Sequence, residues 1–334
     1  MSIDEEIIGN NNTLLSNSNS LSNKDKSNKK LETPPLILIS FLIFVSVFLF
    51  LTTSSINFEF SKNIVLSHQK TNSISMKYLI SESSSKEKEN MTLFNPKYLP
   101  YITSMTLNSK QIPVSSFYNF SSTSNYLLDN FTIYFNSSLL SISNLFSGNN
   151  FLYEVDLSDL ITDSITDMSE LFYSCHSLQH INLKNINTFN VTFLYRIFSD
   201  CISLTSLDLS NFNTDNLYSM NEMFAGSTSL KYINFTGVNT RNVYSMDETF
   251  ARCESLTSLD LSGFYTPKVN NINDMFHGCK NLKYIDMDNF DTSRVFHYDE
   301  MFAGIAENGV IKCNKYIFGE IILQDLPKGW KIIS

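Results

Sequence analysis

The sequence predicts an α/β solenoid in which short strand-turn-helix coils stack into a parallel sheet, carried on a single N-terminal transmembrane helix. Three observations lead to this prediction. A phenylalanine recurs every 26 residues through half of the chain, apolar residues follow it in a strand-like order, and a charge-free apolar run lies near the N-terminus. Because one such coil cannot bury its own apolar face, neighbouring coils must stack on it.

The repeat contains no insertion from its first copy to its last. Its phenylalanines are Phe146, Phe172, Phe198, Phe224, Phe250, Phe276 and Phe302. A leucine stands six residues after each of the first six: Leu152, Leu178, Leu204, Leu230, Leu256 and Leu282. Apolar residues also stand nine and eleven positions after the phenylalanine, as in Leu207 and Leu209. The resulting order, L-x-x-L-x-L, ends in the alternation of a strand with one buried face.

The second half of each copy returns the chain to the next phenylalanine. It carries an apolar residue such as Phe212, then Thr, then apolar residues three apart, as at Val243 and Met246. Spacings of three and four place side chains on one face of a short helix or 3₁₀ turn. Each coil is therefore predicted to be a strand, an outward turn and a short helical return. Six coils at ~4.8 Å per strand form a stack of about 30 Å.

The apolar run at residues 36–51, extended to about 19 residues by Pro35 and the two threonines that follow, is long enough to cross a membrane as a helix. A cleaved signal peptide is the alternative, but 35 residues precede the run, far more than a typical n-region. Four lysines lie shortly before the run and only Lys62 and Lys70 within about 20 residues after it, so the N-terminus is predicted to be cytoplasmic. The repeats then face outward, at the plasma membrane.

The chain divides into six predicted segments. These are a disordered cytoplasmic tail (1–35), a transmembrane signal anchor (36–53), a linker (54–90), an N-terminal cap (91–138), the repeat solenoid (139–304) and a C-terminal cap (305–334). Beyond the anchor, Asn-x-Ser/Thr sequons begin at Asn90, Asn119, Asn130, Asn136, Asn190 and Asn234. They are glycan acceptors if the host glycosylates.

The copy that runs from Cys201 to Phe224, CISLTSLDLSNFNTDNLYSMNEMF, carries a family resemblance. It resembles the BspA-type leucine-rich-repeat surface proteins, in the repeat variant of mycoplasma and protist surface proteins. The match covers residues 139–304, and the tail around Trp330 is similar to the closing segment of that family. The resemblance implies a leucine-rich-repeat-like fold, exposure at the cell surface and adhesion to host proteins or other cells. An N-terminal anchor is not the family's usual arrangement, so the topology depends on hydropathy alone.

Two columns of residues recur at fixed positions of the repeat. Cysteines stand three residues after four of the phenylalanines: Cys175, Cys201, Cys253 and Cys279. Parallel Cβ vectors suit disulfides poorly and a zinc site needs closer pairs, so buried thiols are the simpler interpretation. A threonine occupies one position of every coil: Thr162, Thr188, Thr214, Thr240, Thr266 and Thr292. It is either a flat array that binds a regular surface or, more simply, a hydroxyl ladder that closes the turn.

A third column, Asp or Asn, lies at the exposed strand position: Asp156, Asn182, Asp208, Asn234, Asp260 and Asp286. Calcium between coils is one interpretation, but the Gly-rich nonapeptide of calcium-binding solenoids is absent, which favours caps that solvate the sheet. Variable residues of the same sheet surround this column, and strand-borne tyrosines and charges suit recognition of a partner. The candidate ligand face consists of Tyr153, Glu154, His180, Asp208, Lys231, Tyr232, Asp260, Lys283, Tyr284 and Asp286.

The net charge and the motifs of the sequence limit the classes of function that the protein can have. Residues 151–334 carry 13 basic and 23 acidic side chains, which disfavours nucleic-acid binding. The five histidines show neither metal-ligand spacing nor a nucleophile motif, and no Gly-rich phosphate loop is present, so no enzyme activity, metal or cofactor is predicted. The prediction is a cell-surface adhesion or binding protein for extracellular or host proteins, or for glycans. The alternative is a structural coat that assembles laterally without a ligand, and the oligomeric state stays open.

Overall fold

The computed structural model describes residues 70–79, 91–119, 128–136, 139–314 and 316–334. In this part of the chain, no helix is long and apolar enough to cross a membrane. The predicted tail, the predicted anchor at residues 36–53 and most of the predicted linker lie outside the described residues.

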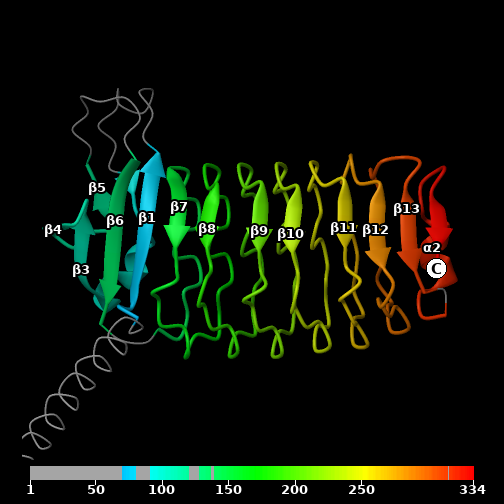
Figure 1. Ribbon diagram of the computed structural model, residues 1–334, viewed down its shortest axis with the longest axis horizontal. Coiled ribbons are helices and arrows are strands. Elements are labelled where there is room, and N and C mark those ends of the chain that lie inside the picture. The colour runs from blue at the N-terminus through cyan, green and yellow to red at the C-terminus, as the bar shows by residue number, and fades with distance from the viewer. Residues whose placement is uncertain (1–69, 80–90, 120–127, 137–138, 315) are drawn as a thin grey trace, which may run out of the picture. The chain divides into compact units, whose positions relative to one another are not determined.

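The repeats form a β-solenoid of about six turns with little helix. Their strands follow one another in a row, all pointing the same way (Figure 1). They are β7 (Leu152–Asp156), β8 (His180–Asn182), β9 (Ser206–Asp208), β10 (Tyr232–Asn234), β11 (Ser258–Asp260), β12 (Tyr284–Met287) and β13 (Val310–Cys313). Equivalent residues 26 apart pair in parallel register, as Glu154 does with His180 and Tyr284 with Val310. The hydrogen-bonded ladder breaks between β8 and β9 and between β10 and β11.

In the described coils the return is not a helix, as one form of the prediction had it, because the chain returns through consecutive turns. In the second coil, the amides of Phe172 and Ser174 donate to carbonyls of the next coil, those of Ile197 and Ser199, at 3.1 and 2.9 Å. The intervening amides close turns on the carbonyl three residues back, and Cys175 donates to Phe172 in this way at 3.1 Å. An α-helix instead requires each amide to bond four residues back within its own segment.

Left-handed residues make these turns. Two residues before each repeat phenylalanine, φ is positive in all seven copies: Asn144, Glu170, Arg196, Glu222, Glu248, Asp274 and Glu300. Two residues after it, φ is positive again, at Gly148, Ser174, Asp200, Gly226, Arg252, Gly278 and Gly304. Such residues interrupt a right-handed helix, and here they alternate with ordinary ones. We call the segment between these two columns the turn strip.

The repeat phenylalanines form the centre of the core, as their periodicity predicts. Their rings stack face to face from coil to coil, with centroids 5.9 Å apart for Phe198 and Phe224 and 5.5 Å apart for Phe224 and Phe250. All seven are at most 2 % exposed. The leucines six residues later are equally buried, so each coil contributes the same layer to one continuous core.

The threonine column is a hydroxyl ladder, as the simpler interpretation predicts. The Thr266 hydroxyl donates to the Asp291 carbonyl at 3.0 Å and accepts from the Asp291 amide at 2.8 Å. Thr214 makes the same pair of bonds with Asn239. Because these hydroxyls are buried and fully engaged, they present no flat array to a ligand.

The cysteine column is a second ladder inside the core. Each thiol donates to the carbonyl of the phenylalanine in the preceding coil, as Cys175 does to Phe146 at 3.0 Å and Cys253 to Phe224 at 3.1 Å. Ser227 stands where a cysteine is missing and donates to Phe198 at 2.7 Å. Burial raises the pKa of Cys175 and of Cys279 to about 12, so these thiols stay protonated and unreactive.

An antiparallel sheet caps the first coil. It contains β1 (Ser73–Leu79), β3 (Ile102–Leu107), β4 (Lys110–Ile112) and β6 (Leu128–Phe135), and β1 joins it to the solenoid by pairing antiparallel with β7. The strand β1 falls within the predicted linker (54–90), so the linker prediction is wrong for these residues. Its alternation buries Ile74, Met76 and Tyr78. The pair β2 (Met91–Thr92) and β5 (Phe117–Tyr118) and a 3₁₀ helix at Pro96–Tyr101 complete the cap.

The C-terminal cap continues the stack. The strand β13 extends the parallel sheet, and β14 (Lys331–Ile333) pairs with β13 beyond a short helix, α2 (Glu320–Gln324). The Trp330 indole donates to the Ala306 carbonyl at 2.7 Å. A Cβ on Gly309 would lie 2.4 Å from the indole ring, so this glycine permits the close approach.

Candidate ligand face

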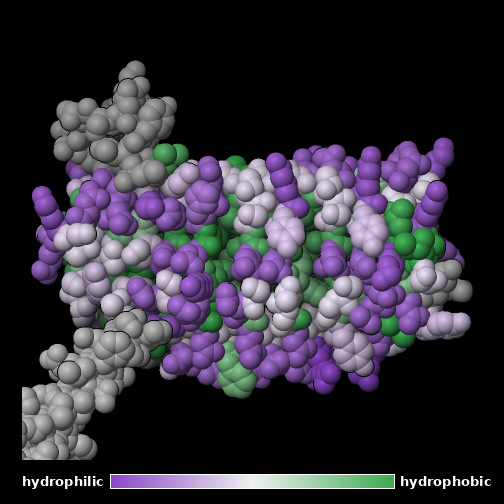
Figure 2. All heavy atoms as spheres, viewed as in Figure 1, coloured by the Kyte–Doolittle hydropathy of each residue, from purple (hydrophilic) through white to green (hydrophobic). Residues whose placement is uncertain are grey.

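The predicted ligand face lies along the strand row of the solenoid. Tyr153 and Glu154 are in β7, and His180, Tyr232 and Tyr284 begin β8, β10 and β12. Asp208 and Asp260 end β9 and β11, Asp286 is in β12, and Lys231 and Lys283 stand immediately before β10 and β12. In the view of Figure 2 hydrophilic side chains dominate the surface, and apolar ones show mainly between them.

At the N-terminal end of this face, the side chains engage one another. Lys77 of the cap pairs with Glu154 at 2.8 Å. The Tyr153 and His180 rings meet edge to face at 5.4 Å, with the hydroxyl 3.5 Å from Nε2. At the other end, Lys312 pairs with Asp286 at 3.3 Å and with Asp288 at 3.1 Å. These exposed pairs order the surface and contribute little to stability.

The Asp and Asn column closes turns. The carboxylate of Asp208 accepts from the Ser210 amide at 2.9 Å, and Asp260 accepts from Ser262 at 2.9 Å. These hydrogen bonds to Ser210 and Ser262 lower the pKa of both aspartates. Asn234 makes the same turn bond to Thr236 and also donates to Asp208 at 2.9 Å. An amide serves as well as a carboxylate here, so the column needs no cation, and the turn-capping interpretation holds.

A hollow of ≈ 610 Å³ opens where the ladder breaks between β10 and β11. Its lining combines two residues of the predicted face, Tyr232 and Asp260, with Asn234, Asn239 and Arg241. Tyr232 is 63 % exposed, whereas Tyr284, in the equivalent position two coils further on, is 37 % exposed. The lining offers an aromatic ring, amides, a carboxylate and a guanidinium within one concavity, which is the composition of a recognition site.

An aromatic and cationic corner next to this hollow was missed from the sequence. Arg241, Tyr265, Lys268 and Arg294 line a second hollow of ≈ 490 Å³. The Arg241 guanidinium lies over the Tyr265 ring at 5.7 Å, and Lys268 lies over Tyr244 at 5.6 Å. Their places in the repeat carry the signal that would have found them. Lys268 and Arg294 both stand eight residues before a repeat phenylalanine, and Arg241 stands nine before one, so stacking of the coils brings these cations to neighbouring positions.

Comparison with known proteins identifies the repeats. The family described as "Mycoplasma protein of unknown function, DUF285" matches residues 140–256 and 205–312, which together span more than half of the chain. No curated protein and no solved structure matches.

Proposed function

Because the chain belongs to the family described as "Mycoplasma protein of unknown function, DUF285", we propose that it is a cell-surface binding protein of the BspA-type leucine-rich-repeat class. It recognises extracellular or host proteins, or glycans, by surface complementarity and without chemistry. Support comes from the difference between the constant and the variable positions of the repeat. Core, threonine and cysteine positions stay nearly constant, whereas the exposed strand positions vary from coil to coil.

The observation that carries the proposal is the hollow beside Tyr232. Tyrosines supply large contact areas at low entropic cost, and tyrosine and arginine are enriched among the residues that dominate binding energies at interfaces. Here Tyr232, Asp260 and Arg241 converge on one concavity of a rigid, repeated scaffold. A partner that fills this hollow would bury the ring of Tyr232, and the neighbouring Arg241 and Tyr265 would extend the contact.

The test uses the full chain in detergent, applied to arrays of extracellular-matrix proteins and of glycans. We expect Tyr232→Ala to weaken the best interaction by about tenfold or more, the scale of a tyrosine hot spot. Tyr316→Ala is the matched control, because Tyr316 is 99 % exposed and lies on the C-terminal cap. Equal binding by both variants would refute the role of the hollow. Oligomers in the absence of any partner would favour the structural coat instead.

The proposal includes a topology in which residues 36–53 anchor the chain and residues 54–334 face outward. Protease treatment of intact cells that express the chain with a tag at each terminus tests it. We expect loss of the C-terminal tag and protection of the N-terminal tag, because the lysines that precede the apolar run favour the cytoplasmic side. Protection of both tags would place the repeats inside a sealed compartment and rule out adhesion.

A further inference from the structure

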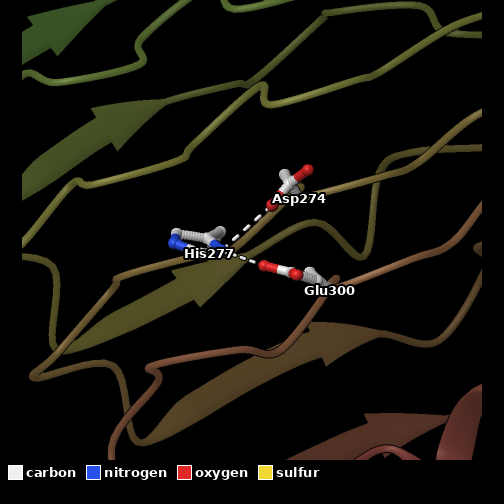
Figure 3. A group of neighbouring side chains, drawn as sticks. All are labelled: Asp274, His277 and Glu300. Carbon is white, nitrogen blue, oxygen red and sulfur yellow. Dashed lines mark ion pairs between the residues drawn. The ribbon is translucent and has the colours of Figure 1, made fainter.

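On the turn strip, far along the stack, one imidazole faces two carboxylates (Figure 3). Nδ1 of His277 lies 2.9 Å from Oδ1 of Asp274 and 3.2 Å from Oε2 of Glu300. Asp274 and His277 belong to one coil, and Glu300 holds the position of Asp274 in the next coil. The sequence alone does not reveal this cluster, because Glu300 lies 26 residues after Asp274 and only the stacking of coils brings the two together.

The repeat itself builds this convergence. Asp274 and Glu300 are both left-handed, with φ of 52° and 55°, and occupy the same column in neighbouring coils. The position of His277 is held by Ala251 in the coil before and by Ala303 in the coil after. Since those neighbours are small, the imidazole lies beside the carboxylate column without competition from a bulky side chain.

The His277 nitrogen lacks a hydrogen-bond partner. Among the described residues, Nδ1 is shielded from solvent and forms no hydrogen bond, although two carboxylate oxygens lie within ion-pair distance. No lysine or arginine of the described residues pairs with either carboxylate, and Arg252 instead pairs with Glu248 at 3.4 Å. With the imidazole neutral, a shielded nitrogen that faces two carboxylate oxygens without a lysine or arginine partner is suited to a cation placed between them.

We propose that Asp274, His277 and Glu300 bind a divalent transition-metal ion, with Zn²⁺ as the preferred ion. Zinc binds imidazole nitrogen and carboxylate oxygen at about 2.0–2.2 Å, so neighbouring ligand atoms around it lie about 3.0–3.5 Å apart. The measured separations from Nδ1 are close to these values, and all three ligand atoms lie within 4.8 Å of one another. One nitrogen and two oxygens favour zinc over magnesium or calcium, which prefer oxygen alone.

The site leaves room at the metal and connects two coils. Three protein ligands leave at least one position for water or for a donor of a partner. The Glu300 side chain is 65 % exposed, so the ion can enter from solvent. Because Glu300 comes from the coil after that of Asp274 and His277, a bound ion cross-links the last two coils of the stack. The site stands independently of the proposed binding function.

Titration calorimetry and thermal unfolding of the untagged full chain in detergent, with ZnCl₂ and with MgCl₂, test the site. We expect one zinc equivalent, a zinc-dependent rise in the unfolding midpoint, and neither effect with magnesium, since a ligand bound only to the folded state stabilises it. His277→Ala should lose both zinc effects. Glu300→Gln, which keeps size and removes charge, should weaken zinc binding by about tenfold or more.

The matched control is His176→Ala, because His176 is an exposed histidine of another coil and lies outside the cluster of three ligands. It should bind zinc as the unchanged chain does. The proposal is overturned if the unchanged chain binds no zinc, or if His277→Ala retains the equivalent while folded by circular dichroism. Loss of binding in His176→Ala equal to that in His277→Ala would also overturn it.

Discussion

Replacement of Phe224 by alanine is expected to lower the free energy of unfolding by about 3–5 kcal/mol. The Phe224 ring is fully buried and stacks on a phenylalanine on each side, at 5.9 and 5.5 Å. Alanine leaves a cavity that neither neighbour can fill, because both are held in register by their own coils. Chemical denaturation of the full chain in detergent measures the loss.

Two further substitutions make this prediction specific. Phe302→Ala should cost less, because the ring of Phe302 stacks on a phenylalanine of only one neighbouring coil, Phe276 at 6.0 Å, and the last coil can fray alone. Phe193→Ala should change stability by no more than about 0.5 kcal/mol, since Phe193 is 51 % exposed. If Phe193→Ala were as costly as Phe224→Ala, the continuous phenylalanine core would not be the source of stability.

Replacement of Thr266 by valine is expected to cost about 1–3 kcal/mol for each of the two backbone groups that it deprives of a partner. Valine has nearly the shape of threonine, so packing is retained while the hydroxyl is lost. The amide and the carbonyl of Asp291, which both bond to that hydroxyl, are then left without it in a partly buried turn. The change in the denaturation midpoint reports the loss.

Two controls separate the hydroxyl from other effects of the threonine substitution. Thr266→Ser keeps the hydroxyl and should recover most of the stability that Thr266→Val loses. Thr257→Val changes an exposed threonine at the start of a strand and should be nearly neutral. A Thr266→Ser variant as unstable as Thr266→Val would mean that the methyl packing, and not the ladder, stabilises the turn.

The solenoid could be predicted because its core is periodic. A phenylalanine and a leucine that recur at one interval, without insertion, require stacked coils whatever the local conformation. The threonine ladder could also be predicted, since a hydroxyl at one position of every coil has the next coil as its neighbour. Both predictions depend on which residues are buried, and the pattern of apolar residues along the sequence indicates which residues are buried.

The turn strip could not be predicted in the same way. Consecutive turns and a short helix both bring apolar residues together at spacings of three and four, so the residues that lead into the strip, such as Val243 and Met246, fit either. The usual marker of left-handed backbone is glycine, yet residues such as Glu248 and Arg252 occupy those positions here. The hydrogen bonds between coils stabilise this left-handed backbone, which the local sequence does not favour.

The residues of the predicted ligand face lie along the strand row, as the repeat pattern predicts. The hollow beside Tyr232 was not predicted. The hollow beside Tyr232 lies where the ladder breaks between β10 and β11, and no residue type signals that break. Strand β1 is a different case. The alternation of Ile74, Met76 and Tyr78 was present in the sequence, but the polar residues that follow it suggested a linker.

The hydrogen bonds of the turn strip give this strip an electrical polarity along the stack. From coil to coil these amides donate toward the C-terminal neighbour, as Phe146 does to Leu171 and Phe276 to Met301, both at 3.0 Å. The corresponding peptide dipoles therefore align and add, as they do in a helix but with the positive pole at the C-terminal end. An added coil would continue this row of aligned dipoles and lengthen it.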